Sequence, residues 1–159
     1  MKILILSDSH GDTVYLSEII SRHNVDKTLH LGDLEISKDF FPMTIVRGNS
    51  YMDPEAPLER VIEVDGKRLF MTHGHIYSVH NGLTSINLKA QSVNADYCLF
   101  GHTHIPCYKT NKGILFINPG AISRPRNGRS SYMILDTSSD SCILYNLLGE
   151  EIKTYERSN

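Results

Sequence analysis

Short apolar runs that stop at polar residues recur along this chain. Five runs rich in leucine and β-branched residues end abruptly at a polar residue, usually beside a glycine. This pattern is typical of buried strands that lead into loops. The predicted strands, each with the polar residues that follow it, are Ile3–Ser7 before Asp8, Thr28–Leu31 before Gly32-Asp33, Met43–Val46 before Arg47-Gly48-Asn49, Arg68–Thr72 before His73, and Asp96–Phe100 before Gly101-His102.

Helices and turns are predicted between and after these strands. One helix is expected from Asp12 or Thr13 to about His23, and Leu83–Val93 has a similar apolar spacing. The later chain differs, because turn signals at 65–66 and 111–113 indicate hairpins, and the segments 131–135 and 142–148 read as consecutive strands. We therefore expect an α/β fold with two sheets packed face to face and helices on the outside, not one doubly wound sheet.

Length and charge limit the class of protein. A chain of 159 residues with 40% hydrophobic content is expected to form one domain over residues 1–159. Lys and Arg number 16 against 18 for Asp and Glu, which disfavours extended nucleic acid as a partner. The apolar run Met1–Leu6 is too short for a signal peptide or a membrane span, so no membrane is expected. The three cysteines have no metal-ligand spacing and fit a reducing cytoplasm.

The polar residues at the strand ends form one chemically coherent set. The carboxyl ends of strands in open α/β sheets gather several loops over a rigid scaffold, so we expect these side chains to face one cleft. Carboxylates and imidazoles together suit first-row ions better than an all-oxygen magnesium or calcium site. The candidate ligands are Asp8, His10, Asp33, Asn49, His73, His102 and His104.

The spacing of these residues suggests two ions. In Asp8-Ser9-His10 and His102-Thr103-His104, an extended backbone would turn both outer side chains to the same side. Seven ligands exceed the four of a closed structural zinc site, so we expect two ions that share a bridging carboxylate. Two such ions leave about two net positive charges after two carboxylates are counted, which favours an anionic substrate such as a phosphate.

The same residues carry a family resemblance. The motifs Asp-x-His, Gly-Asp, Gly-Asn, His-Gly-His and Gly-His-Thr-His follow one another between Asp8 and His104. In this order and spacing they resemble the calcineurin-like metallophosphoesterase superfamily, above all its small, single-domain YfcE-type phosphodiesterases. The resemblance covers Met1 to about Ser123. It implies a four-layer α/β/β/α sandwich with two mixed β-sheets, which agrees with the two-sheet prediction.

The resemblance also implies a role for each candidate ligand. Asp8, His10 and His104 would hold the first metal, Asn49, His73 and His102 the second, and Asp33 would bridge both. The implied reaction is in-line attack on a phosphodiester by a hydroxide that bridges two divalent ions. We expect Mn²⁺ first, with Ni²⁺, Co²⁺, Fe²⁺ and Zn²⁺ as alternatives.

One departure from the family pattern affects protonation of the leaving group. Phosphoprotein phosphatases of the superfamily place a general-acid histidine directly after the metal-binding asparagine, and the small phosphodiesterases usually read Asn-Cys-Asp there. This chain has Asn49-Ser50-Tyr51. We therefore expect good leaving groups to be favoured. His75, two residues beyond His73 on a segment taken as extended, is either a proton donor or a residue that orients His73.

Other polar residues are assigned to the substrate or to the scaffold. Asn49, Arg47 and Arg124 are candidates to contact the substrate phosphate, although Arg47 is equally suited to pair with a carboxylate. Arg126 is expected to lie in a solvated loop. His30, inside a strand run, is expected to be a hydrogen-bonded core residue, and His80 a helix-end or loop residue.

The resulting hypothesis is a cytoplasmic phosphodiesterase that acts on a small phosphate ester. A phosphomonoesterase and a nucleotide phosphatase are the alternatives within the enzyme class. A non-catalytic scaffold is a further alternative, because the retromer subunit resembles these enzymes in fold. The sequence leaves a homo-oligomer open and does not identify the physiological substrate.

Overall fold

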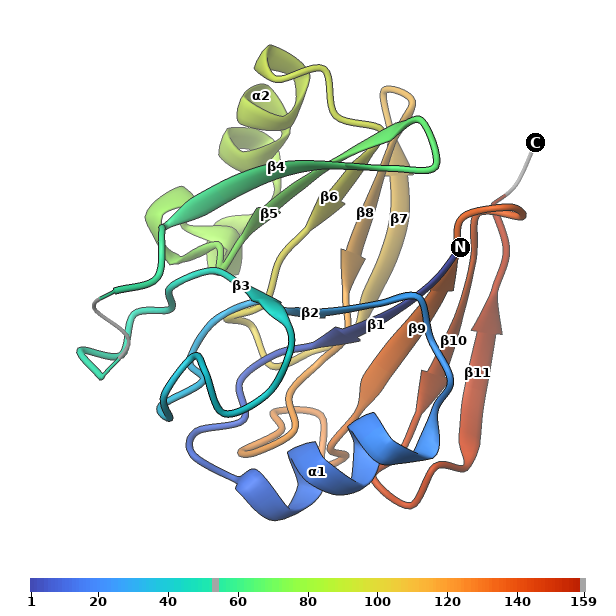
Figure 1. Cartoon of the computed structure of the whole chain (residues 1–159). Coiled ribbons are helices and arrows are strands. Elements are labelled where there is room, and N and C mark those ends of the chain that lie inside the picture. The colour runs from blue at the N-terminus through green and yellow to red at the C-terminus, as the bar shows by residue number, and fades with distance from the viewer. Residues whose placement is uncertain (53–54, 158–159) are drawn as a thin grey trace.

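Two mixed β-sheets and two α-helices make up the fold (Figure 1). The computed structural model describes residues 1–52 and 55–157. The first sheet has the order β11-β10-β9-β1-β2-β3, formed by Glu151–Tyr155, Ser141–Tyr145, Tyr132–Asp136, Lys2–Leu6, Lys27–His30 and Thr44–Ile45. The second has the order β4-β5-β6-β8-β7, formed by Glu59–Val64, Lys67–Thr72, Tyr97–Leu99, Ile114–Asn118 and Cys107–Asn111. The helices are α1 (Thr13–Arg22) and α2 (Thr84–Ser92), and the short 3₁₀ helices are η1 (His75–Tyr77) and η2 (Val79–Asn81).

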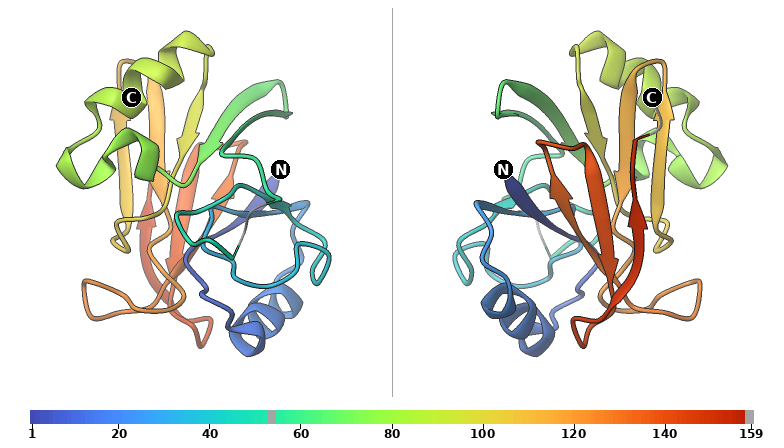
Figure 2. Two further views of the ribbon diagram at one scale, coloured as in Figure 1. Left: turned by 90° about the vertical axis from the view of Figure 1, so that its left-hand side faces the viewer. Right: turned by 90° about the vertical axis from the view of Figure 1, so that its right-hand side faces the viewer.

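The central strands are buried on both faces, which explains their continuous apolar runs. In β1, Ile3 and Ile5 face the second sheet, whereas Leu4 and Leu6 pack against α1. In the second sheet, Phe70 of β5 packs against α2. The views in Figure 2 show α1 and α2 on opposite outer sides of the paired sheets. The four-layer α/β/β/α sandwich is therefore confirmed.

Parallel pairing aligns the strand ends that carry the candidate ligands. β1, β2 and β3 run parallel in the first sheet, and β5, β6 and β8 run parallel in the second. The carboxyl ends of β1, β2 and β5 point to the left in Figure 1, away from both termini. Loops from both sheets thus converge at one end of the sandwich.

The predicted elements are largely confirmed, with specific differences. Asp12 caps α1 by accepting a hydrogen bond from the Tyr15 N–H at 3.0 Å. The turns at 65–66 and 112–113 have positive φ at both central residues, as tight hairpins require. The strand predicted at Met43–Val46 is only two residues long, and edge strand β11 was not predicted. None of the helices in the described part of the chain has the length and apolar character needed to cross a membrane.

An ionic cluster joins the two sheets at the end opposite the candidate ligands. Asp140, in the turn between β9 and β10, accepts hydrogen bonds from Lys67 of β5, Tyr97 of β6 and Arg157. Burial tends to raise the pKa of the Asp140 carboxyl, but these three donors outweigh it and hold the pKa below its usual value. The ionised carboxylate therefore stabilises the packing of one sheet on the other.

We expect Asp140→Asn to lower the free energy of unfolding by about 1–3 kcal/mol at pH 7. The φ of Asp140 is 51°, a left-handed conformation that asparagine also tolerates, so the change removes mainly the charge. Because the folded pKa is depressed, the stabilisation is present above the unfolded value of about 3.9 and is lost as the pH falls through the folded value. Urea unfolding of both proteins from pH 7 to pH 2.5 measures this.

The exposed Asp39→Asn variant is the control and should unfold like the wild type. Equal stability of wild type and Asp140→Asn at pH 7, or a difference that does not shrink in acid, would contradict the role given to the Asp140 carboxylate.

Candidate metal centre

The candidate ligands come from the ends of strands in both sheets. Asp8 and His10 follow β1, Asp33 follows β2, Asn49 follows β3, His73 follows β5, and His102 and His104 follow β6. Asp8 and His73 are fully buried, and Asp33 is almost so. Segments far apart in the sequence thus deliver polar side chains to the seam between the sheets.

A first group brings together Asp8, His10 and His104. Each offers one ligand atom, and these atoms lie within 4.8 Å of one another. Nε2 of His104 lies 2.9 Å from Oδ1 of Asp8. These are the three residues expected to hold the first ion.

A second group consists of Asp8, Asp33 and His73, again within 4.8 Å. Nε2 of His73 lies 3.5 Å from Oδ2 of Asp33, 3.8 Å from Oδ1 of Asp8 and 3.0 Å from Oδ1 of Asn49. Oδ2 of Asp33 also lies 3.9 Å from Nε2 of His10, so this oxygen stands between the two groups. Asp8 is the residue that belongs to both groups.

His102 lies at the edge of this arrangement. Its ring centroid is 5.0 Å from that of His73, but its nitrogens belong to neither group of close ligand atoms in the described chain. Burial first, and then the nearby His73 and His80, lower the pKa of His102 to about 4, so its ring is neutral and able to act as a ligand.

The donor set fits divalent cations. Oδ1 of Asp8 and Nε2 of His10 are buried and form no hydrogen bond with the described residues. Buried polar atoms without a partner are costly, and a bound cation would satisfy both. Carboxylates with neutral imidazoles suit manganese, iron, cobalt, nickel or zinc.

Three histidines present the same nitrogen to the centre. Nδ1 of His73 donates to the Leu31 carbonyl at 2.7 Å, Nδ1 of His104 to the Arg124 carbonyl at 2.7 Å, and Nδ1 of His10 lies 2.8 Å from the Glu35 carboxylate. A proton held on Nδ1 leaves Nε2 free to bind a metal. The tautomer of each ring is therefore set by its outer hydrogen bond.

The backbone at these positions is left-handed rather than extended. The φ angles of Asp8, His10, His102 and His104 are 54°, 46°, 67° and 58°. The prediction that an extended backbone turns each pair to one side is therefore wrong. Hydrogen bonds between loops stabilise this left-handed backbone. One of them runs from the Asp8 N–H to the Gly32 carbonyl at 3.0 Å. Such φ values are uncommon for residues other than glycine and tend to gather at functional sites.

Two glycines of the motifs are required by close packing. A Cβ atom on Gly48 would lie 1.9 Å from Oδ1 of Asp33, and one on Gly101 would lie 2.1 Å from the Ser7 hydroxyl oxygen. No larger residue fits at either place without displacing the carboxylates. The glycines therefore allow the loops to approach the centre.

The carboxylates and the imidazoles shift each other's ionisation. Burial tends to raise the pKa of the Asp8 carboxyl, but His104, His73 and the Ser7 hydroxyl hold it below its usual value. Burial opposes a low pKa at Asp33 as well, and His73 together with the Ser50 N–H outweighs it. The pKa of His104 is raised first by its contact with Asp8. The centre thus holds ionised carboxylates that attract cations.

His75 lies beside the centre in a conformation that was not predicted. It begins the 3₁₀ helix η1 after Gly74, whose φ is 103°, so the segment beyond His73 is not extended. The His75 ring centroid is 5.4 Å from that of His73 and 6.0 Å from that of His102. Burial lowers its pKa, and its buried Nδ1 has no hydrogen-bond partner among the described residues. Because the Leu31 carbonyl holds His73, an orienting role for His75 gains no support.

Three arginines lie around the centre in different ways. Arg47 is close enough to His75 to contribute to lowering its pKa. Arg124 touches the centre through its backbone carbonyl, and its side chain is exposed. Arg126 is exposed in a loop, as expected, and its Nη1 lies 3.5 Å from Nδ1 of His80.

Sequence reasoning missed two residues of the centre. Glu35 follows the Gly-Asp motif without any pattern of its own, yet its carboxylate contacts His10. The His80 ring centroid lies 4.5 Å from that of His102, although η2 is distant in sequence. By contrast, His30 is a buried core residue, as expected. The Gly32 N–H donates to its Nδ1 at 3.2 Å, and its Nε2 lies 3.0 Å from the Ser9 hydroxyl.

Comparisons with known proteins find relatives that match along most of the chain. A model of the calcineurin-like phosphoesterase superfamily domain matches residues 1–140. The probable metallophosphoesterase YsnB of Bacillus subtilis is 34% identical over 161 residues, covering 96% of this chain and 95% of that protein. Phosphodiesterase YfcE of Escherichia coli is 28% identical over 179 residues, covering 92% and 93%.

Solved structures extend the comparison to the fold. A conserved protein from Streptococcus pneumoniae, described as a predicted phosphoesterase, superposes with a TM-score of 0.87 at 31% identity, covering 98% of this chain and 97% of that one. Vps29 from Entamoeba histolytica superposes with a TM-score of 0.81 at 19% identity, covering 99% and 100%. The latter likeness shows a shared fold only.

Changes at Glu35 test how His10 is held. We expect Glu35→Gln, whose amide oxygen still accepts from Nδ1, to weaken Mn²⁺ binding slightly, and Glu35→Ala to weaken it by about 10–100-fold. Isothermal titration of metal-stripped protein with MnCl₂ measures the affinity.

The exposed residue Glu63, changed to Ala, is the matched control. Wild-type Mn²⁺ affinity in Glu35→Ala, with a normal fold by circular dichroism, would show that the contact does not support the metal ligand.

Proposed function

The chain belongs to the calcineurin-like phosphoesterase superfamily, and from this premise we propose that it is a phosphodiesterase that works with two divalent metal ions. The family identifies it as a metal-dependent phosphoester hydrolase. The observation that carries the finer proposal is a pair of ligand groups that share Asp8. Two buried atoms of these groups, Oδ1 of Asp8 and Nε2 of His10, form no hydrogen bond in the described chain.

The two ions would be held by overlapping ligand sets. Asp8, His10 and His104 would hold the first, and Asn49, His73 and His102 the second. Asp33 would bridge them, a role supported by its Oδ2, which lies 3.9 Å from Nε2 of His10 and 3.5 Å from Nε2 of His73. Two divalent ions would activate water and stabilise negative charge on the phosphoryl oxygens.

The protein's own residues position the phosphate and control its access to water. Two carboxylates against two divalent ions leave a site with net positive charge, which favours an anionic phosphate ester. Arg47, Arg124 and Asn49 are proposed to contact phosphate oxygens, with Arg126 added because its guanidinium reaches the rim at His80. Substrate binding thus relies on positive charge from the arginines and the metal ions.

Protonation of the leaving group is proposed to be weak. Ser50 follows Asn49, and the Ser50 N–H donates to Oδ1 of Asp33 at 2.9 Å, so this position supports the bridging carboxylate instead of supplying an acid. His75, beside His73 and His102, is the proposed donor. Diesters with good leaving groups are therefore the favoured substrates.

Alternative functions differ in what they require of the centre. A phosphomonoesterase or nucleotide phosphatase would use the same ions on a dianion. A non-catalytic scaffold is considered because of the fold likeness to Vps29. Such a scaffold would not require the candidate metal ligands. The two groups of close ligand atoms, which among the described residues contain Asp8, His10, Asp33, His73 and His104, favour catalysis.

We further propose Mn²⁺ as the working metal, residues 1–159 as one domain, and the cytoplasm as the compartment. The thiols Cys98, Cys107 and Cys142 are all unpaired, in keeping with a reducing environment. The arrangement of the candidate ligands neither requires nor excludes a homo-oligomer.

The function is tested with metal-stripped protein assayed on mono- and diesters after each metal is added. We expect bis(4-nitrophenyl) phosphate to turn over much faster than alkyl monoesters, with Mn²⁺ among the most effective ions. Asp33→Asn should lower kcat/KM by at least about 100-fold with every metal, because the shared bridge is lost.

Asp39→Asn is the control and should retain full activity. Metal-independent hydrolysis, or similar rates for aryl diesters and alkyl monoesters, would contradict the proposal.

His75→Gln tests the proton donor. We expect kcat/KM for phenyl esters, which have a poor leaving group, to fall by about 10²-fold, whereas 4-nitrophenyl esters should change little. Rates are compared across a series of phenols of increasing pKa. An equal loss along the whole series would assign His75 to positioning rather than proton transfer.

A further inference from the structure

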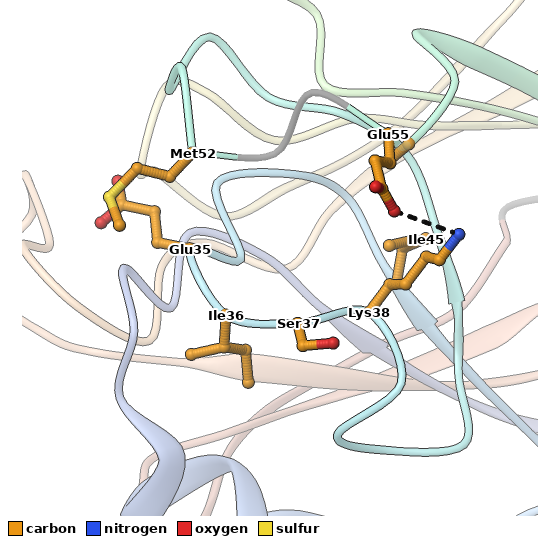
Figure 3. A pocket seen from close by; sticks show the side chains of 8 residues that line it. Glu35, Ile36, Ser37, Lys38, Ile45, Met52 and Glu55 are labelled. Carbon is orange, nitrogen blue, oxygen red and sulfur yellow. Dashed lines mark ion pairs between the residues drawn. The ribbon is translucent and has the colours of Figure 1, made fainter.

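A pocket of about 420 Å³ lies next to the candidate metal centre (Figure 3). Its connection to the centre is Glu35, which lines the pocket and also contacts Nδ1 of His10 at 2.8 Å. A molecule in the pocket is therefore separated from a candidate metal ligand by one side chain. The volume falls in the range of roughly 300–1,000 Å³ that is usual for small-molecule sites.

The pocket has an apolar lining with charge at its margins. Ile36, Ile45, Met52 and Ala56 supply the apolar surface. Figure 3 shows Met52 near Glu35 at one end and the ion pair of Lys38 with Glu55 at the other. Such a surface suits an organic group rather than an ion.

Exposed apolar side chains follow shortly after Asn49, beyond Ser50. Tyr51 is 91% exposed and Met52 is 54% exposed. Burial of such apolar surface by a ligand removes it from water and is favourable. These two large apolar side chains are exposed to solvent near a proposed metal ligand. Together they form a surface that suits an apolar group.

Volume alone does not distinguish this pocket. Another hollow of about 420 Å³ lies between α1 and Phe40–Phe41, but none of its lining residues belongs to the candidate centre or contacts it. The pocket at Glu35 differs because it adjoins the place where the phosphate would bind.

We propose that this pocket binds the second organic substituent of a phosphodiester, the one that stays on phosphorus when the other leaves. The inference rests on the proposed function and explains a preference for diesters, because a monoester has no second substituent to place there. The substituent is an uncharged aryl or alkyl group.

The charges at the pocket argue for an uncharged substituent. Nζ of Lys38 lies 3.5 Å from the Glu55 carboxylate, which balances its positive charge. The third charge at the pocket, that of Glu35, is negative. The lining thus has no surplus positive charge for a further phosphate. A substituent that carries its own anionic group would meet net repulsion.

The test measures binding separately from turnover. Diphenyl phosphate and dimethyl phosphate carry the same charge and differ only in their substituents. Isothermal titration of Mn²⁺-loaded protein should show diphenyl phosphate binding at least about fivefold more tightly. Met52→Ala should remove most of this advantage and leave the affinity for dimethyl phosphate unchanged, and Met52→Asp should weaken diphenyl phosphate binding further.

Leu148→Ala is the matched control, because Leu148 is also exposed and apolar but does not line this pocket. Unchanged diphenyl phosphate affinity in both Met52 variants, equal losses for both diesters, or equal binding of both by the wild type would each overturn the proposal. Failure of the proposed function itself would instead be seen as absent turnover of bis(4-nitrophenyl) phosphate by wild-type protein.

Discussion

The fully buried carboxylate of Asp8 is the constraint on which the rest of the centre depends. An ionised carboxylate away from water must be balanced by positive charge and by hydrogen bonds. Here it is supported by the Ser7 hydroxyl and the His102 N–H and faced by His73 and His104. Its remaining oxygen has no hydrogen bond within the described chain, and Asp8 is the residue that both groups of close ligand atoms share. A cation at this point would neutralise the buried carboxylate. The same cation is what the proposed reaction requires.

A rigid scaffold makes such a crowded arrangement possible. Strands buried on both faces hold the loop ends in place, and the loops then adopt left-handed conformations that isolated chains rarely visit. Glycines at 48 and 101 let the backbone approach the carboxylates. Outer hydrogen bonds fix the imidazole tautomers, so that Nε2 faces inward at His10, His73 and His104. Little reorganisation would then be needed when a metal binds.

Local patterns predicted the sheets and the ligand types, because a buried strand and its abrupt polar end are both visible in a few consecutive residues. Contacts set by tertiary structure were not visible. Glu35 meets His10 only because two loops are hydrogen-bonded together, through His10 N–H to Asp33 and Gly11 N–H to Leu34. The same is true of the Asp140 cluster and of His80 beside His102. Edge strand β11 escaped prediction because it is largely exposed and so has few apolar residues to mark it.

The proposed function rests on a candidate metal centre at the seam of two sheets, with an apolar pocket at its side. Anomalous diffraction at the manganese absorption edge, from crystals soaked in MnCl₂, tests the centre most directly. Two peaks on either side of the Asp33 carboxylate, about 3.5–4 Å apart, are the predicted result. No anomalous density among the seven side chains, or manganese bound only elsewhere on the protein, would contradict it.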